Sequence, residues 1–155
     1  MSDSSILGRA QQFLTALRHC QVLGIQVHSA VPSGLTLRLP YSAQIVGNPE
    51  TGVIHGGAIT TLMDTTCGIA TVCVLAEFEI CPTIDLRIDY MRAAKPNQDV
   101  FGFAECHRVT ADIIFVRGYA YQDDQNEPIA HVVGTFMRMG KTNKTIKLEQ
   151  PGTEQ

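Results

Sequence analysis

One carboxylate stands inside a long uncharged stretch of this sequence, and its isolation suggests chemistry. Asp64 is the only charged side chain between His55 and Glu77. Burying a lone carboxylate is costly unless it is paired or protonated, so its presence needs a reason. The structural reason would be a hydrogen bond from the hydroxyl of Thr60 or Thr61, one turn earlier, or exposure to water at a helix edge. The functional reason would be a place in a functional site.

A second group with chemical potential begins the same stretch. His55, Gly56 and Gly57 follow one another, and two glycines leave backbone N–H groups unobstructed where a helix dipole presents its positive end. Such a place suits a phosphate, a carboxylate or a developing oxyanion. Alternatively, the glycines only allow a tight entry into the helix and His55 only lies near its cap. The combination with Asp64 and with Asn48 upstream is a more specific signal of a functional site than the tripeptide alone.

The spacing between these groups predicts more than one subunit. Gly57 and Asp64 are seven residues apart, which is about 10 Å along a helix. The carboxylate therefore cannot act on an atom held by the Gly57 N–H of its own chain. If both serve one carbonyl, the carboxylate comes from a neighbouring subunit, with two long helices antiparallel around a twofold axis. An oligomer also suits a chain in which only 17% of residues are charged, because interface cores are depleted in charge.

The elements that position these residues begin with a central helix. Apart from His55 and Asp64, residues 55–76 are apolar residues, threonines and glycines on every face, and such a helix must be enclosed. A membrane span is the alternative, but five threonines, Gly68 and Asp64 interrupt the apolar run, and neither flank resembles an anchor. We therefore expect no membrane contact. Since no other segment is a helix long enough to enclose this one, a sheet must do so.

Later segments supply that sheet. In residues 83–90 apolar side chains alternate with polar ones, which predicts a strand with one buried and one polar face. Three further β-rich runs predict an antiparallel meander. These runs are 100–109, 113–121 and 129–139. The remaining expectations are an N-terminal helix at 1–20, a hairpin at 24–39, a turn-rich loop at 41–52 and a frayed tail at 141–155.

This order of elements predicts an α+β fold in which an antiparallel β-sheet curls around one long central helix, with a short N-terminal helix. The 155 residues are the size of one ordinary domain, so we expect a single domain over 1–155.

Composition argues against several classes of ligand and partner. The chain has 12 Lys and Arg against 15 Asp and Glu, which offers no basic field for a nucleic acid. The five cysteines include no C-x-x-C pair, so we expect reduced thiols, and the histidines show no ligand spacing, so we expect no metal. The first ten residues do not resemble a secretory signal, which makes a cytoplasmic location the expectation.

Three segments carry a resemblance to a known family. They are residues 48–58, with His55-Gly56-Gly57; Asp64, nine residues after the histidine; and 83–90, a strand ending in Tyr90 with Arg92 to Lys95 beyond it. Over about residues 20–140 the chain resembles the PaaI-like (phenylacetyl-CoA-type) branch of the hotdog-fold acyl-CoA thioesterases. The resemblance implies a hotdog fold and hydrolysis of an acyl- or aryl-CoA to free acid and CoA. It further implies a homodimer or a dimer-of-dimers homotetramer with shared active sites.

The resemblance also implies a role for each matching residue. Gly57 donates its backbone N–H to the thioester carbonyl, and Asn48 and His55 orient or polarise that carbonyl. Asp64 of the partner subunit acts as nucleophile or as general base for water. Thr83 stands where some members place a serine that holds the water, so the hydroxyl is kept and a methyl is added. The loop between Asn48 and His55 is slightly longer than in some members.

The substrate-binding prediction adds Gly56, beside Gly57, and Arg92, which follows the strand and could meet a CoA phosphate. No cofactor is implied, because a thioester has a good leaving group and one oxyanion donor with one carboxylate can suffice. No serine lies in a Gly-x-Ser-x-Gly context, so a serine hydrolase is unsupported. A hotdog dehydratase or hydratase is disfavoured because Ile69 stands where its helix carries a glutamate. A non-catalytic acyl-CoA binding module remains the alternative.

Overall fold

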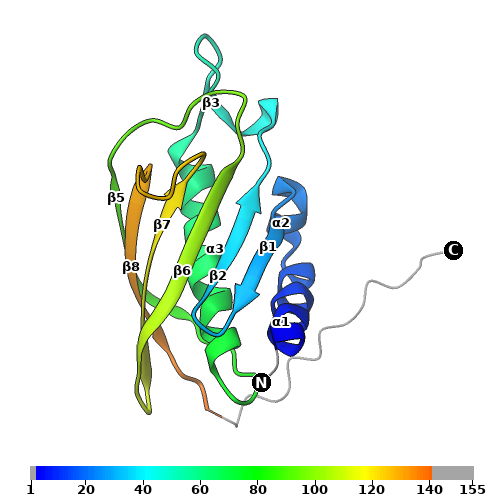
Figure 1. Cartoon of the computed structure of the whole chain (residues 1–155), viewed down its shortest axis with the longest axis vertical. Helices are drawn as coiled ribbons and strands as arrows, with labels where there is room; N and C mark the ends of the chain where they lie inside the picture. The colour runs from blue at the N-terminus through cyan, green and yellow to red at the C-terminus, as the bar shows by residue number, and fades with distance from the viewer. Residues whose placement is uncertain (1–2, 141–155) are drawn as a thin grey trace, which may run out of the picture.

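The computed structural model describes residues 3–140, and its centre is one long helix partly enclosed by a curved sheet (Figure 1). The predicted frayed tail at 141–155 lies outside the described residues. The helices are α1 (Asp3–Ala16), α2 (Arg18–Leu23) and α3 (Gly56–Val74), with one turn of 3-10 helix, η1 (Ala43–Ile45). The strands are β1 (Gln26–Val31), β2 (Gly34–Leu39), β3 (Val46–Asn48), β4 (Val53–Ile54), β5 (Thr83–Tyr90), β6 (Val100–Val109), β7 (Ile113–Tyr121) and β8 (Ala130–Met137).

The main sheet has six strands in the order β1-β2-β6-β7-β8-β5, and every neighbouring pair is antiparallel. Strands β3 and β4 form a separate two-stranded ribbon, which projects at the top of Figure 1. Helix α3 packs against β6, β2 and β7, and α1 packs against β1 and α3 (Figure 1). The predicted α+β class, with an antiparallel sheet around a central helix, is confirmed.

The buried face of α3 forms the middle of the hydrophobic core. Gly102 of β6 allows the helix to lie close to the sheet, because a Cβ there would come within 2.9 Å of Met63 Sδ and Thr66 Oγ1. By length and composition alone, helix α3 could span a membrane. However, 61% of its most apolar 18-residue segment is buried inside the fold. This burial is what a core helix requires.

The start of the chain differs from the single predicted helix. Leu17 has an extended backbone and separates α1 from α2, and α2 ends at Gly24 with φ 67°. The break lets the backbone N–H of Ile25 bond to Cys20 O at 2.9 Å, while Cys20 itself is fully buried. The chain thus turns tightly into β1, and the predicted hairpin follows as β1 and β2.

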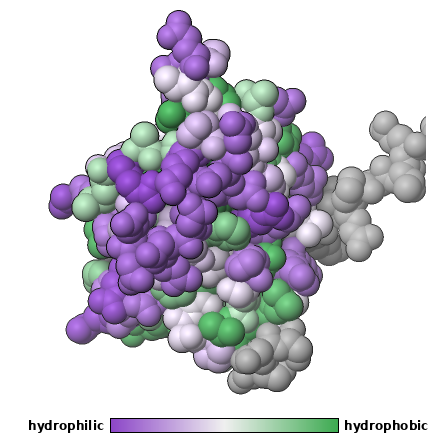
Figure 2. Space-filling view, turned by 45° about the horizontal axis from the view of Figure 1, so that its top comes forward, coloured by the Kyte–Doolittle hydropathy of each residue, from purple (hydrophilic) through white to green (hydrophobic). Residues whose placement is uncertain are grey.

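The meander predicted from the last three β-rich runs is confirmed as β6, β7 and β8, which pair in chain order. Strand β5 lies outside it, because it pairs with β8 at the end of the sheet while β6 pairs with β2. Its apolar face is not buried throughout, since Ile84 is 50% and Tyr90 49% exposed. Alternation shows which side chains share a face, but it does not say which strand lies beside them. In Figure 2, hydrophobic residues reach the surface on the left, the side where Figure 1 places β5.

The predicted loop at 41–52 contains more regular structure than expected. It holds η1 and β3, and the turn after Asn48 leads into β4. Gly52 in this turn has φ 73°, a conformation that glycine adopts without steric cost. The β3–β4 ribbon leads directly into the start of α3.

Candidate active site

The first turn of α3 is organised by His55. His55 is the N-cap residue, and its Nδ1 accepts a hydrogen bond from the Gly57 N–H at 2.9 Å. Its own N–H donates to Ile45 O at 2.8 Å. Gly47 of β3 allows His55 to lie this close, because a Cβ at position 47 would be 2.9 Å from His55 Cα. Since Nδ1 accepts, the neutral ring is assigned its proton on Nε2.

This cap bears directly on the predicted oxyanion donor. The exposed Gly57 N–H points at the His55 ring, so it can serve a ligand only by sharing its proton or after the ring turns away. The Nε2–H of the exposed His55 ring is a second donor at the same helix end. His55 and Gly57 are therefore bonded to each other, and this bond occupies the N–H that was predicted to hold the oxyanion.

Tyr90 ties the same turn to the end of β5. Its hydroxyl donates to Gly56 O at 2.6 Å and lies 2.8 Å from Thr60 Oγ1. Sequence reasoning used Tyr90 only as part of a motif and assigned it no role. The available signal was its position in the alternating strand, on the same side as Leu86 and Ile88, which pack against the core.

Asp64 meets Thr83 farther along the helix. The Thr83 hydroxyl donates to Asp64 Oδ1 at 3.1 Å, and the carboxylate is partly exposed. Thr83 begins β5, and the register with β8 is irregular between Thr83 and Asp85. The preceding residue is anchored by the bond from Met137 N–H to Pro82 O. The hydroxyl of Thr61, one of the partners considered for Asp64, instead bonds to Gly57 O at 2.9 Å.

Asn48 lies in the turn that precedes the helix. Its Oδ1 accepts the Glu50 N–H at 3.0 Å, and its carbonyl accepts the Gly52 N–H at 2.8 Å. Within residues 3–140 no hydrogen bond joins it to His55 or Asp64. In the structure this side chain stabilises the turn of the β3–β4 ribbon.

Arg92 follows β5 and is largely engaged with the backbone. Its Nη2 donates to Glu127 O at 2.6 Å, Nη1 contacts Ala93 O at 3.4 Å, and Nε is buried with no partner in the described part of the chain. With Gly56 and Tyr90 it lines an open hollow of about 340 Å³ beside the start of α3. The other lining residues are Val53, Ile54, Ile59, Met91, Ala93 and Ala94. Of the three predicted substrate-binding residues, Gly56 and Arg92 line this hollow and Gly57 does not.

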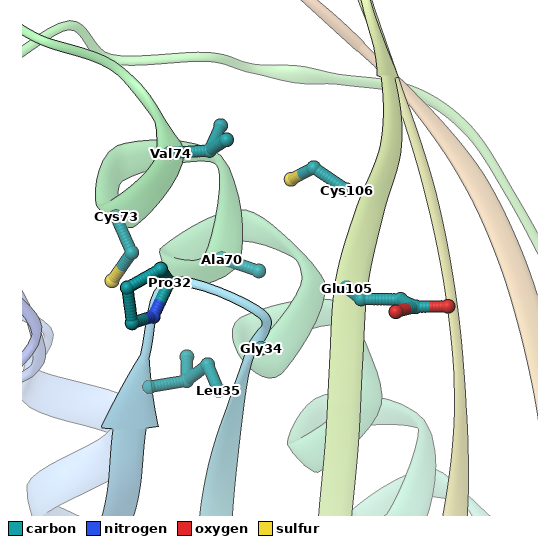
Figure 3. Close-up of a pocket in the computed structure, with 8 residues that line it drawn as sticks. All are labelled: Pro32, Gly34, Leu35, Ala70, Cys73, Val74, Glu105 and Cys106. Atoms are coloured by element: carbon teal, nitrogen blue, oxygen red, sulfur yellow. The ribbon is translucent and has the colours of Figure 1, made fainter.

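A second, smaller cavity lies near the C-terminal end of α3 (Figure 3). Two thiols line it, and neither is activated. It measures only about 20 Å³ and is lined in part by Cys73, Cys106 and Glu105. Burial raises the pKa of Cys73 to about 11 and that of Cys106 to about 12. Both side chains therefore stay protonated and weakly nucleophilic. Over residues 3–140, no three His, Cys, Asp or Glu side chains are grouped to hold a metal ion.

Comparisons with known proteins bear on the family and the fold of this chain. The family model described as the thioesterase superfamily matches residues 51–129, which is 79 of the 155 residues. A protein of Halobacterium salinarum whose name provisionally describes an esterase is 36% identical over 76 residues, covering 47% of this chain. That match spans only half of the relative's length.

Solved structures extend the likeness to the whole fold. A crystal structure of a protein from Pseudomonas aeruginosa is 72% identical, with 86% of this chain and 99% of that chain covered and a TM-score of 0.81. The E. coli PaaI protein from the phenylacetic acid degradation operon is 17% identical, with coverage of 89% and 96% and a TM-score of 0.78. A thioesterase from Haemophilus influenzae is 18% identical, with coverage of 86% and 90% and a TM-score of 0.74. The latter two likenesses concern the fold.

Proposed function

This chain belongs to the thioesterase superfamily, and from that premise we propose that it hydrolyses the thioester bond of an acyl- or aryl-CoA, releasing the free acid and CoA. The observation that carries the proposal is the Asp64 carboxylate, partly exposed on a core helix and held by the Thr83 hydroxyl at 3.1 Å. Asp64 acts as nucleophile or as general base for water, and Thr83 orients the carboxylate or the water.

The first turn of α3 supplies the other half of the chemistry. The thioester oxygen becomes negatively charged as the tetrahedral intermediate forms, and donors aimed at it lower the barrier. The Gly57 N–H and the Nε2–H of His55 are the donors at this helix end. Asn48 supports them by holding the turn that leads to His55. Gly56 and Arg92 line the hollow that receives part of the substrate.

A second copy of the chain completes the site in this proposal. Strand β5 is the end of the sheet, so its outer edge is available for another strand. Antiparallel pairing about a twofold axis near the middle of β5 places the Thr83 end of one strand beside the Tyr90 end of the other. Because Thr83 holds Asp64 and Tyr90 holds Gly56, the carboxylate of one chain approaches the helix start of its partner. The same pairing would cover Ile84, which is half exposed.

The test is a panel of short, medium, long and aryl acyl-CoAs assayed by release of free thiol. We expect Asp64→Ala to lower kcat at least about 100-fold, as the loss of a general base or nucleophile does. The matched control is Asp112→Ala, which removes an exposed carboxylate from the β6–β7 hairpin and should leave turnover unchanged. Unchanged turnover in Asp64→Ala would refute the assignment. No turnover by the wild type, together with thermal stabilisation by CoA, would favour a non-catalytic binding module.

Subunit mixing tests the shared site separately. Asp64→Ala and His55→Ala proteins, each impaired alone, should regain activity when unfolded together and refolded as mixed oligomers. In a site shared across the interface, a mixed dimer contains one site with both changes and one with neither. No regained activity from mixed oligomers would show that each chain holds a complete site.

A further inference from the structure

A continuous chain of hydrogen bonds leads from Thr60 through Tyr90 to the cap of α3. The Tyr90 hydroxyl gives its single proton to Gly56 O at 2.6 Å, so the 2.8 Å contact with Thr60 must be a donation from Thr60 Oγ1 to the Tyr90 oxygen. On the other side, the Gly57 N–H donates to His55 Nδ1 at 2.9 Å.

The central link of this chain is one peptide group. The carbonyl of Gly56 and the N–H of Gly57 belong to the same amide, whose electrons are delocalised across O, C and N. A hydrogen bond received at the oxygen draws density from the nitrogen and makes the N–H a stronger donor. In condensed phase this cooperative strengthening is about 10–30% per bond.

We propose that Tyr90 is a positioning residue that orients and polarises the Gly56–Gly57 peptide, so that the Gly57 N–H is a better oxyanion donor. The inference rests on the proposed function, because it extends the role of the same donor. The Tyr90 oxygen lies within hydrogen-bond distance of both Gly56 O and Thr60 Oγ1, although Tyr90 as a whole is 49% exposed. At such exposure water could satisfy the hydroxyl, so these two hydrogen bonds are not required merely to solvate it.

Gly56 has a matching requirement. A Cβ at position 56 would lie 3.3 Å from the Tyr90 oxygen and 3.4 Å from the ring carbon that bears it, closer than most real Cβ contacts. A glycine at this position therefore leaves room for the phenol to reach the carbonyl. Strand β5 then serves both halves of the chemistry, with Thr83 on the carboxylate at one end and Tyr90 on the donor peptide at the other.

The first experiment is Tyr90→Phe, with Tyr119→Phe as the matched control. Tyr119 bonds to Gln125 Oε1 at 3.2 Å on the sheet, away from α3. We expect Tyr90→Phe to lower kcat about 5-fold, the equivalent of a net hydrogen bond of ~1 kcal/mol, with KM almost unchanged. An oxyanion donor acts in the transition state, so its weakening appears in kcat. A changed KM with unchanged kcat would overturn the proposal.

A second experiment separates polarisation from space filling. Fluorinated tyrosines, incorporated only at position 90, keep the ring while making the phenol a stronger donor. At a pH where all of them stay protonated, kcat should rise as the phenol becomes more acidic. A flat series would overturn the proposal, because a residue with a purely packing role would not respond to phenol acidity.

The third readout needs no turnover and keeps the inference distinct from the proposed function. The amide ¹⁵N resonance of Gly57 should shift in Tyr90→Phe, shift less in Thr60→Val, and stay in place in Tyr119→Phe. A Gly57 resonance unmoved by Tyr90→Phe would overturn the polarisation even if Asp64→Ala abolishes turnover. Conversely, active Asp64→Ala would refute the thioesterase mechanism while this shift still reports on the peptide.

Discussion

Replacing Arg138 by methionine should lower the free energy of unfolding by about 3 kcal/mol at pH 7, because it strands a buried carboxylate. Arg138 follows β8, and its Nε and Nη2 reach the two oxygens of Glu79 at 2.9 and 3.1 Å. Its Nη1 also donates to Thr110 O at 3.0 Å. The Glu79 side chain is only 9% exposed and that of Arg138 26%. Water can therefore replace the guanidinium only in part.

The loss should depend on pH in a definite direction. The hydrogen bond from Arg138 is the main reason that the pKa of Glu79 lies below its ordinary value. A depressed folded pKa contributes stability above the unfolded value of about 4.3, and that contribution is lost as the pH falls through the folded pKa. In the methionine variant, acid also neutralises the stranded carboxylate. The gap between the two proteins should therefore narrow from pH 7 toward pH 4.

Urea unfolding followed by circular dichroism at pH 7 and pH 4.5 measures both effects, at one fixed protein concentration because an oligomer's stability depends on it. Arg108→Met, which removes an exposed arginine of β6, should change stability by less than about 0.5 kcal/mol. The double variant Glu79→Leu/Arg138→Met should recover much of the loss, since no unpaired charge remains. A loss under about 1 kcal/mol, or an equal loss at both pH values, would refute the reasoning.

The remaining predictions concern close packing and thiol reactivity. Gly118→Ala should destabilise the fold by more than about 3 kcal/mol, because a Cβ there would lie 2.0 Å from Phe103 O; a thermal midpoint equal to the wild type would contradict that contact. Gly8→Ala meets nothing within 4 Å and should raise stability by about 0.5–1 kcal/mol in the same assay. Cys73 and Cys106, with pKa values of about 11 and about 12, are about 0.1% thiolate or less at pH 8. Ellman's reagent should modify them only on unfolding, and labelling at the rate of a free thiol would count against their burial.

Much of the architecture follows from local pattern. The uncharged run at 55–76 predicted the core helix, and α3 occupies residues 56–74 of it. The runs at 100–109 and 113–121 coincide with β6 and β7. These predictions succeed because periodicity and uniform apolarity are properties of a segment by itself.

The pairing of β5 could not be found in the same way. Its alternation correctly predicted a strand, but the alternation of Ile84 and Tyr90 with polar residues is equally compatible with a central and an edge position. Only the assembled sheet shows β5 at the end, beside β8. The half exposure of Ile84 and Tyr90 is then explained by their position on an edge strand.

By itself the sequence determined which groups could take part in chemistry: Asp64 as an isolated carboxylate, and His55 with two glycines at a helix start. The rise of a helix also separated these groups by about 10 Å within one chain. Only the tertiary structure decided that Thr83 holds the carboxylate, that His55 occupies the Gly57 N–H, and that Tyr90 holds the other end of that peptide. The physical reason is that helical spacing is local, whereas hydrogen bonds between a helix and a strand depend on where the sheet places that strand.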